Sequence, residues 1–350
     1  MKFKSLKFVL FLFVIVAVFV ACEEEDDPIQ NEFVEEDRTE QQAKDKDSIL
    51  NYLNSHYYNS EFFETGTNHN IEDIVITELT EGEDVPAGHT LLIEDVVTKT
   101  TTYVDVEYEY YYLLLNQGGG EAPAFTDKVR VRYEGFFVDG GDTFDQVSTP
   151  IDLDLYGIAF GTGAITGWQR IMPEFNTATN FTIGNDNIVT YDNYGLGVMF
   201  VPSGLGYFSF PRTGIPVYSN LIFKFELLQT EVNDHDGDGI PSYIEDYDGS
   251  LDPFDDNTDD DAAPDYIDLD DDGDGVFTIN ELLPTTYVVD TNMGETEPEL
   301  GDNEYELNRE EDGGIITIET VTLVDTNDNG IFDHLDEEVT TNYNEDEDEG

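Results

Sequence analysis

The last third of this 350-residue chain is so rich in Asp and Glu that apolar burial alone cannot fold it. Four twelve-residue stretches in it carry oxygen-bearing side chains at positions 1, 3, 5 and 12, which is the spacing of a loop that surrounds a calcium ion. We therefore expect structural Ca²⁺ in these loops. The predicted ligands are Asp234, Asp236, Asp238 and Glu245; Asn257, Asp259, Asp261 and Asp268; Asp270, Asp272, Asp274 and Glu281; and Asp325, Asn327, Asn329 and Asp336.

The surroundings of these loops argue against paired EF-hands. A predicted strand, not a helix, leads into the first loop, and only Leu269 separates the second from the third. Pro241 and Pro264 stand at position 8, where they leave no N–H for pairing of one loop with another. The first three loops instead resemble thrombospondin type 3 repeats, in which the chain wraps around ions with little other core. Ala262 replaces the usual glycine of the second loop and is expected to weaken it. The alternative is a solvated acidic tail.

The charge balance also limits the partners of the whole chain. There are 79 acidic and 14 basic residues, a net charge of −65, which argues against nucleic acid because phosphate binding needs clustered Lys and Arg. Aromatic residues make up 13% of the chain, including 23 Phe and 20 Tyr, so we expect a folded core. The five His residues lack zinc-site spacing, and no phosphate-binding loop or nucleophile elbow is present.

The first 21 residues have the pattern of a secretory signal. Three lysines precede an uncharged run from Phe8 to Ala21, which is short for a bilayer span. Cys22, the sole cysteine, follows that run and resembles the lipid-modified cysteine of a bacterial lipobox, so we expect an anchor in the cell envelope, at the outer membrane. The alternatives are a free thiol or a membrane-spanning start. The acidic run at 23–27 resembles a surface-export signal, and it equally fits a solvated linker.

Residues 22–45 are expected to be a disordered acidic tether, and order is expected to begin after them. Ile49, Leu50, Leu53 and Tyr57 recur at helical spacing, which predicts a short amphipathic helix. Several β-rich or alternating stretches follow between residues 71 and 137, broken by Gly and Pro. These features predict a mostly antiparallel sheet with little helix.

Four motifs within this sheet-rich part occur in the same order as in a known family. They are "DKVRVRYEGFFVDGGDTFDQV", "GTGAITGWQRIMPEF", "VPSGLGYFSF" and "TGIPVYSNLIFKFELLQTE". Together they resemble the motifs of FKBP-type peptidyl-prolyl isomerases, and the resemblance covers residues 108–231, about a third of the chain, called here the FKBP-like region. It implies an α+β fold in which a curved antiparallel sheet wraps one short helix.

The resemblance also implies an apolar pocket for proline. It makes Trp168 the floor and gives the wall, peptide-holding and polar roles to other residues at matching positions. These are Tyr133 and Phe144 as walls, Ile165 through its backbone N–H, Tyr207 through its hydroxyl, Phe223 as the closing ring, and Asp145 as the polar group near the amide. Isomerisation of an X–Pro bond breaks no covalent bond, so no cofactor is expected for it. The aromatic residues could instead form only a sheet core.

Three departures from the family pattern bear on the pocket. Phe208 stands where a glycine usually follows the pocket tyrosine, and residues 176–197 lengthen the path from the helix to the third motif. The segment 150–163 is also longer than in the minimal family member, which leaves Ile151 a tentative wall residue. We expect these changes to alter pocket shape and rate.

The sequence thus predicts a membrane-anchored isomerase that acts on proline-containing segments of exported or surface proteins. The rival hypothesis is a non-catalytic surface protein that binds Pro-containing peptides and uses the repeats as a calcium-stiffened spacer or adhesion module. The predicted divisions are a signal peptide (1–21), a tether (22–45), a helix and strands (46–107), the FKBP-like region (108–231), the acidic segment (232–283), a small β unit with the fourth loop (284–341) and a disordered acidic tail (342–350).

Overall fold

The computed structural model describes residues 34–140, 142–159 and 161–344. The predicted signal peptide, Cys22, the acidic run behind it and most of the predicted tail lie outside the described residues. From Asp37 onward the described residues belong to one compact unit. No helix among them is long and apolar enough to span a bilayer.

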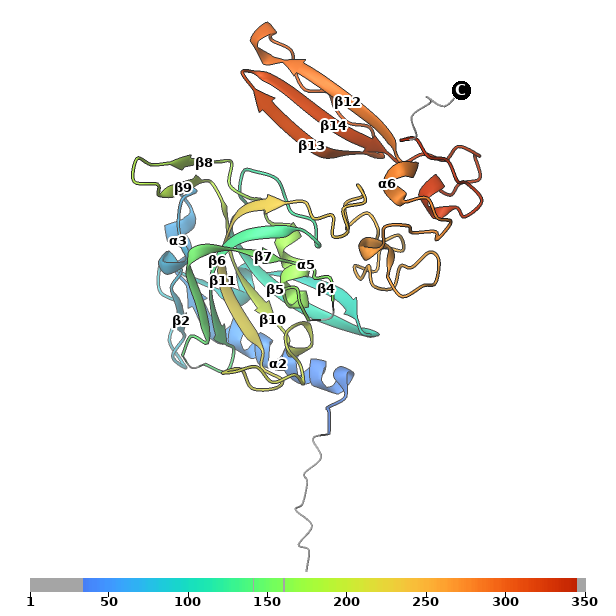
Figure 1. The fold of residues 1–350 in the computed structure, drawn as a ribbon. Helices are drawn as coiled ribbons and strands as arrows, with labels where there is room; N and C mark the ends of the chain where they lie inside the picture. Colours follow the sequence, from blue (N-terminus) through green and yellow to red (C-terminus); the bar gives the residue numbers. More distant parts are fainter. Residues whose placement is uncertain (1–33, 141, 160, 345–350) are drawn as a thin grey trace, which may run out of the picture. The chain divides into compact units, whose positions relative to one another are not determined.

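A six-stranded antiparallel sheet dominates the middle of the chain, as the alternating stretches predicted (Figure 1). Its strand order, β4-β5-β10-β11-β6-β7, places strands that are distant in sequence side by side. Strand β11 contacts both β10 and β6, so it lies at the centre. The strands are β4 (Val97–Tyr103), β5 (Val106–Asn116), β6 (Lys128–Phe137), β7 (Asp145–Asp154), β10 (Gly195–Val201) and β11 (Leu221–Glu231).

One face of this sheet packs against the short helix α5 (Thr166–Ile171) and the 3₁₀ turn η2 (Met172–Glu174). Alternate residues of each strand supply this face, because successive side chains of a strand point to opposite sides. Trp168 is buried there against Phe223 and Phe225. The arrangement is the sheet-and-helix architecture that the sequence predicted.

The opposite face is covered by the N-terminal helix α2 (Arg38–Ser55). Ile49 and Leu53 are fully buried against side chains of β5 and β10. The predicted helix is therefore confirmed for Ile49, Leu50 and Leu53, but it ends at Ser55, and Tyr57 lies in β1 (His56–Tyr58). The helix also starts at Arg38, so the expectation of disorder up to residue 45 is wrong for residues 38–45. The Asp37 side chain accepts hydrogen bonds from the Thr39 and Glu40 N–H groups and caps the helix.

The first turns of α2 are tied to the FKBP-like region by a buried polar contact. Asp45 accepts hydrogen bonds from the Ser203 N–H at 3.0 Å and from the Ser203 hydroxyl at 2.6 Å. Ser203 belongs to the 3₁₀ turn η3 (Ser203–Leu205), which precedes Tyr207. The helix thus supports the loop that carries the predicted pocket tyrosine.

Small elements fill the remaining N-terminal part and the long insert. The three-stranded sheet β2-β1-β3 packs near α2, and the insert forms the hairpin β8 (Asn180–Ile183) and β9 (Val189–Asp192). The elements before β4 are β1 (His56–Tyr58), α3 (Ser60–Phe63), η1 (Ile71–Asp73), β2 (Ile76–Glu78), β3 (Thr90–Leu91) and α4 (Leu92–Asp95).

The acidic segment has little regular structure, as expected, with only η4 (Asp265–Ile267) and α6 (Thr278–Glu281). A three-stranded antiparallel sheet of order β12-β14-β13 follows and corresponds to the small β unit. Its elements are β12 (Leu283–Asp290), η5 (Thr291–Met293), β13 (Glu304–Asp312), β14 (Ile315–Thr322) and the later turn η6 (Asp333–Leu335).

Candidate functional site

A cavity of 1140 Å³ lies on the face of the six-stranded sheet that carries α5. It is lined by residues from β6, β7, α5 and β11 and from the loop that follows η3. The structure brings together in this one cavity every residue that the FKBP resemblance singled out. These are Tyr133, Phe144, Asp145, Ile165, Trp168, Tyr207 and Phe223. Ile151, the tentative wall residue, is not among the lining residues.

Aromatic rings form the inner surface of the cavity. The ring centroid of Trp168 lies 5.4 Å from that of Tyr133 and 5.4 Å from that of Phe223, both in edge contacts. Phe144 contacts Phe223 in the same way, at 5.6 Å. Edge contacts of this kind fix the ring orientations and leave faces for an apolar ligand. The cavity is therefore suited to a small apolar ring such as that of proline.

Gly135 in β6 is required by the close approach of two of these rings. A Cβ atom at this position would lie 2.7 Å from Cζ of Phe144 and 2.9 Å from Cε1 of Phe223. Both distances are shorter than real Cβ contacts allow, so any side chain would push the rings apart. The glycine in "YEGFF" thus sets the width of the cavity.

Few polar groups face this aromatic surface. The Tyr133 hydroxyl donates to Oδ2 of Asp145 at 2.7 Å. Burial, and then the hydrogen bond to Asp145, raises the pKa of Tyr133 above its usual range, so its hydroxyl keeps its proton near neutral pH. Burial likewise raises the pKa of Tyr207, over whose ring the Arg212 guanidinium lies at 5.3 Å. The cavity can therefore offer hydroxyl donors to a ligand.

Phe208, the departure beside Tyr207, takes a left-handed backbone conformation with φ of 47°. This conformation is costly for a bulky residue and ordinary for glycine. Contacts stabilise it here, because the Phe208 ring is buried under the Arg38 guanidinium at 4.0 Å and contacts Tyr218. The backbone therefore keeps the shape that glycine would allow, and the side chain joins the loop to α2.

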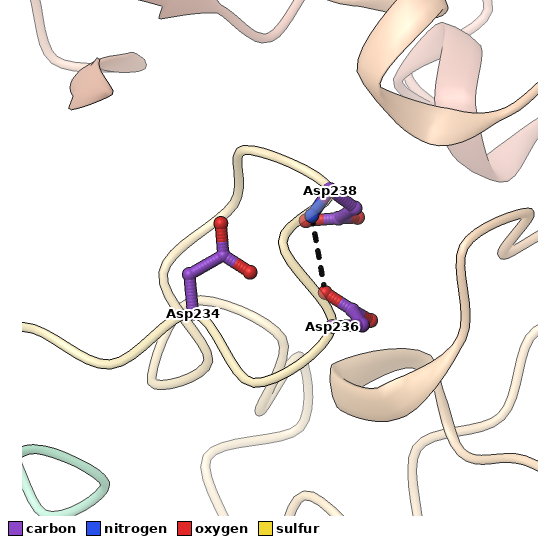
Figure 2. Close-up of side chains that lie close together, drawn as sticks. All are labelled: Asp234, Asp236 and Asp238. Carbon is purple, nitrogen blue, oxygen red and sulfur yellow. Dashed lines mark hydrogen bonds between the residues drawn. The ribbon is translucent and has the colours of Figure 1, made fainter. Parts of the chain in front are cut away.

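A second set of candidate residues lies in the acidic segment, where carboxylates of the first loop converge (Figure 2). One ligand oxygen from each of Asp234, Asp236 and Asp238 lies within 4.8 Å of the others. Asp238 also donates its N–H to Asp236 Oδ1 at 3.2 Å, while Asp234 accepts from the Gly239 N–H at 3.0 Å. Gly239, sixth in the loop, has φ of +100°, which the turn requires. These three predicted ligands therefore form one group.

Glu245, the predicted twelfth-position ligand, belongs to a neighbouring group with Asp238 and Asp271. All three side chains are buried, and neither carboxylate oxygen of Glu245 or of Asp271 has a hydrogen-bond partner. Burial, followed by nearby carboxylates, raises the pKa of Asp271 to about 10 and raises that of Glu245 well above its usual range. Buried carboxylates without partners fit a divalent cation, which would replace the protons.

The predicted ligands of the other three loops come together only in part. Asp259, Asp261 and Asp268 form one group, and Asp270, Asp272 and Asp274 form another. Glu281, the last ligand of the third loop, is buried, and both of its carboxylate oxygens lack a hydrogen-bond partner. In the second loop, the Asn257 side-chain amide donates to the Ala263 carbonyl at 2.8 Å. In the fourth loop, the amides of Asn327 and Asn329 donate to Oδ2 of Asp336, at 2.9 and 2.7 Å, and Asp325 accepts from the Asn329 N–H.

Two features of the acidic segment were missed by the spacing rule. Asp271 stands at position 2 of its loop, so a rule based on positions 1, 3, 5 and 12 passes over it. Asp246, Asp248 and Asp256 form a further group that spans eleven residues instead of twelve. The "DYDG" that begins this group has the Asp-x-Asp-Gly pattern of the first and third loops and could have revealed it.

Comparison with known proteins gives a curated relative over about a third of the chain and a family model that matches part of its C-terminal third. The chain is 27% identical over 121 residues to the FKBP-type 22 kDa peptidyl-prolyl cis-trans isomerase of Escherichia coli, which covers 34% of this chain and 48% of that protein. Residues 235–300 match a family model described as BamM C-terminal. This match runs from the acidic segment into β12 and so crosses the predicted boundary at residue 283.

Two solved structures are similar to part of the chain. FkpA from Escherichia coli is 27% identical, with a TM-score of 0.27, over 35% of this chain and 48% of that one. A peptidyl-prolyl cis-trans isomerase from Pseudomonas syringae is 23% identical, with the same TM-score, over 35% of this chain and 75% of that one. The chain is thus homologous to FKBP-type isomerases over about a third of its length, and it spans about half the length of the curated relative it matches.

Proposed function

We propose that this protein is a peptidyl-prolyl cis–trans isomerase that assists the folding of exported or surface proteins. The observation that carries the proposal is the convergence of Tyr133, Phe144, Asp145, Ile165, Trp168, Tyr207 and Phe223 on one aromatic cavity. Homology to FKBP-type isomerases over about a third of the chain supports it.

The proposed catalysis follows from amide resonance. Rotation about an X–Pro bond crosses a barrier of about 18–20 kcal/mol because the planar amide is resonance-stabilised. The twisted amide has lost that resonance and is less dipolar, so an aromatic cavity that excludes water binds it better than the planar form. Catalysis is this difference in binding, and each 1.36 kcal/mol or so gives a tenfold gain in rate.

Several of the lining residues have a part in this proposal. Trp168, Phe144 and Phe223 enclose the proline ring, and the Tyr207 hydroxyl donates to the substrate carbonyl. Asp145 accepts a hydrogen bond from the Tyr133 hydroxyl and thereby holds the Tyr133 ring against Trp168, whose ring centroid is 5.4 Å away. No cofactor takes part, because no group is transferred.

Measured isomerisation of an X–Pro peptide by the full-length protein tests the proposal. Phe144→Ala and Tyr207→Phe are expected to lower kcat/KM about tenfold or more, since each removes a contact to the twisted amide. Phe181→Ala, in the exposed hairpin of the insert, is the matched control and should leave the rate unchanged. A folded protein that binds such peptides without accelerating their isomerisation would contradict catalysis and favour the non-catalytic peptide-binding protein.

In the same proposal the acidic segment and the fourth loop hold structural calcium. The unpartnered, buried oxygens of Glu245, Asp271 and Glu281 support it, because oxygen ligands of this charge are those that Ca²⁺ prefers. The groups that would hold the ions are those built from Asp234, Asp236 and Asp238, and their counterparts in the later loops.

The proposed location is the cell envelope, with lipid on Cys22. It rests on the sequence pattern alone. Incorporation of labelled fatty acid in a Gram-negative host, lost in Cys22→Ser, is the expected result. A wild-type protein that carries no label would contradict the anchor without affecting the isomerase proposal.

A further inference from the structure

The cavity is not built by the FKBP-like region alone. Leu251, Asp252 and Phe254, which belong to the acidic segment, line the same cavity as Trp168 and Phe144. They lie in sequence well beyond β11, the last strand of the FKBP-like region. One wall of the cavity is therefore supplied by a segment that the isomerase motifs do not include.

Arg170 attaches this wall to the helix that carries Trp168. The Arg170 side chain is only 5% exposed, and its Nη2 donates to the Leu251 carbonyl at 3.1 Å. Its Nε donates to the hydroxyl of Thr101 in β4, also at 3.1 Å. A buried guanidinium held at two points is rigid, so the backbone at Leu251 is fixed relative to α5.

Tyr156 provides a second attachment, from the segment that is longer than in the minimal family member. Its hydroxyl donates to Asp252, and its ring contacts Phe254 with a centroid distance of 5.9 Å. Its ring also contacts Tyr266, whose hydroxyl donates to the Gly157 carbonyl at 3.0 Å. The extra length of the segment 150–163 thus seats the acidic segment against the cavity.

Several large apolar side chains at the cavity are exposed. Phe254 is 39% exposed and Phe210 is 55% exposed, and Val104 beside the cavity is exposed as well. Large apolar side chains left in water around a cavity are typical of a ligand-binding surface. The cavity volume of 1140 Å³ also exceeds the range of about 300–1,000 Å³ that suits a small ligand.

We propose that Leu251 and Phe254 form a second subsite for an extended polypeptide substrate. The proline occupies the aromatic inner part, and a large apolar side chain of the same peptide, such as Leu or Phe, packs against Phe254. The proposal rests on the proposed function and deepens it, since it names the substrate class as an unfolded chain with an apolar residue near its proline. The acidic segment then selects substrates in addition to any role in holding ions.

The test compares two kinds of peptide on the full-length protein. One is a blocked Ala-Ala-Pro-Ala tetrapeptide. The others are longer Ala peptides with the same centre, and each carries a single Leu at a different position. These positions reach about four residues from the proline, a span of about 13 Å. Both the dissociation constant and kcat/KM are measured. We expect one Leu position to improve both by about tenfold over an all-Ala peptide of equal length.

Phe254→Ala should abolish this preference, and Phe254→Tyr should keep it. Phe277→Ala is the matched control, because Phe277 lies in the acidic segment, is 56% exposed and does not line the cavity. The subsite would be overturned if Phe254→Ala and Phe277→Ala kept the same preference for the Leu peptide. It would also be overturned if the wild type preferred no Leu position.

Failure of the subsite and failure of catalysis give different results. If the wild type turns over no peptide, the proposed function fails, and the binding data alone decide on the subsite. A preferred Leu position that is lost on Phe254→Ala would then still support it. Normal turnover of the tetrapeptide without any preference would overturn the subsite and leave the isomerase intact.

Discussion

The FKBP-like region and the acidic segment bury opposite kinds of side chain. In the first, Trp168, Phe223 and Phe225 are buried among other aromatic and aliphatic residues of the sheet. In the second, the buried side chains include the carboxylates of Asp238, Glu245, Asp271 and Glu281, several of whose oxygens have no hydrogen-bond partner. The hydrophobic effect is sufficient to fold the first region, whereas the second needs its buried charges neutralised.

This contrast gives a physical reason for the division of the chain. Burial of apolar area needs no partner, so the FKBP-like region is expected to keep its fold in any ordinary buffer. Burial of unpaired carboxylates costs several kcal/mol per group unless protons or cations bind there. The order of the acidic segment, and with it the cavity wall at Leu251 and Phe254, should therefore depend on solution conditions.

The largest expected effect is that of calcium on thermal unfolding. A ligand at 100 times its dissociation constant stabilises by about 2.7 kcal/mol per site, and extracellular calcium modules bind at about 10⁻⁴–10⁻³ M. In calorimetry of the full-length protein, about 10 mM calcium should move the transition of the acidic segment to higher temperature and leave that of the six-stranded sheet in place. Magnesium should act weakly because it demands tighter octahedral geometry. Identical scans with calcium and with chelator would contradict this.

Glu245→Gln should have effects of opposite sign with and without calcium. In chelator the variant should be more stable by about 1–3 kcal/mol, because it replaces a buried, unpartnered carboxylate with a neutral group. In calcium it should be less stable than the wild type, since a charged ligand is lost. Calorimetry in both buffers measures the sign, and Glu299→Gln, at an exposed position, is the control. The same sign in both buffers would show that Glu245 is not a cation ligand.

Gly135→Ala should damage the FKBP-like region and leave the calcium response unchanged. The new Cβ would lie 2.7 Å from Phe144 and 2.9 Å from Phe223, and overpacking of this kind costs about 1–3 kcal/mol. Urea unfolding followed by the fluorescence of Trp168, the only tryptophan, measures the loss. Gly301→Ala is the control, because its nearest neighbouring atom is 3.7 Å away. Equal stability of the two variants would mean that the rings move aside without cost.

Asp127→Asn tests the cost of a single buried carboxylate in the FKBP-like region. Burial raises the pKa of Asp127 to about 6, above its unfolded value of about 3.9. The folded state then binds the proton more tightly, so stability is full below pH 4 and falls as the pH rises through 6. The Asn side chain keeps an acceptor for the Ala124 N–H. Relative to Asp127→Asn, the wild type should lose about 2 kcal/mol of stability between pH 4 and 7. Urea unfolding across this pH range should show that the free energies of unfolding of the wild type and of Asp127→Asn diverge. Free energies that change in parallel with pH would exclude the raised pKa of Asp127.

The FKBP-like region was predictable because its motifs are local and its strands alternate. The antiparallel sheet, the short helix under Trp168 and the helix over Ile49 and Leu53 all follow from patterns within single segments. The start of α2 at Arg38 was not predictable, because Gln41, Gln42 and Asp45 are polar and yet buried. Asp45 is ordered by its bond to Ser203, a contact between residues 158 positions apart.

The candidate sites were predictable where the sequence signal is local, as it is in the FKBP-like motifs and within single acidic loops. Sequence spacing gives the ligands within a loop, but Glu245 lies with Asp271 of another loop, and that pairing depends on the three-dimensional path of the chain. The contribution of Leu251 and Phe254 to the cavity was equally hidden, because it depends on the bond from Arg170 to the Leu251 carbonyl. Contacts between distant segments carry no periodic signal in the sequence.

Hydrogen exchange of the full-length protein, resolved by peptide mass spectrometry, tests the contrast between the two regions most directly. On transfer from calcium to chelator, amides between residues 234 and 281 should lose protection by at least tenfold, while amides of β10 and β11 should exchange at unchanged rates. Equal protection of the acidic segment in both buffers, or a parallel loss in the six-stranded sheet, would contradict the claim that cations order one region and apolar burial the other.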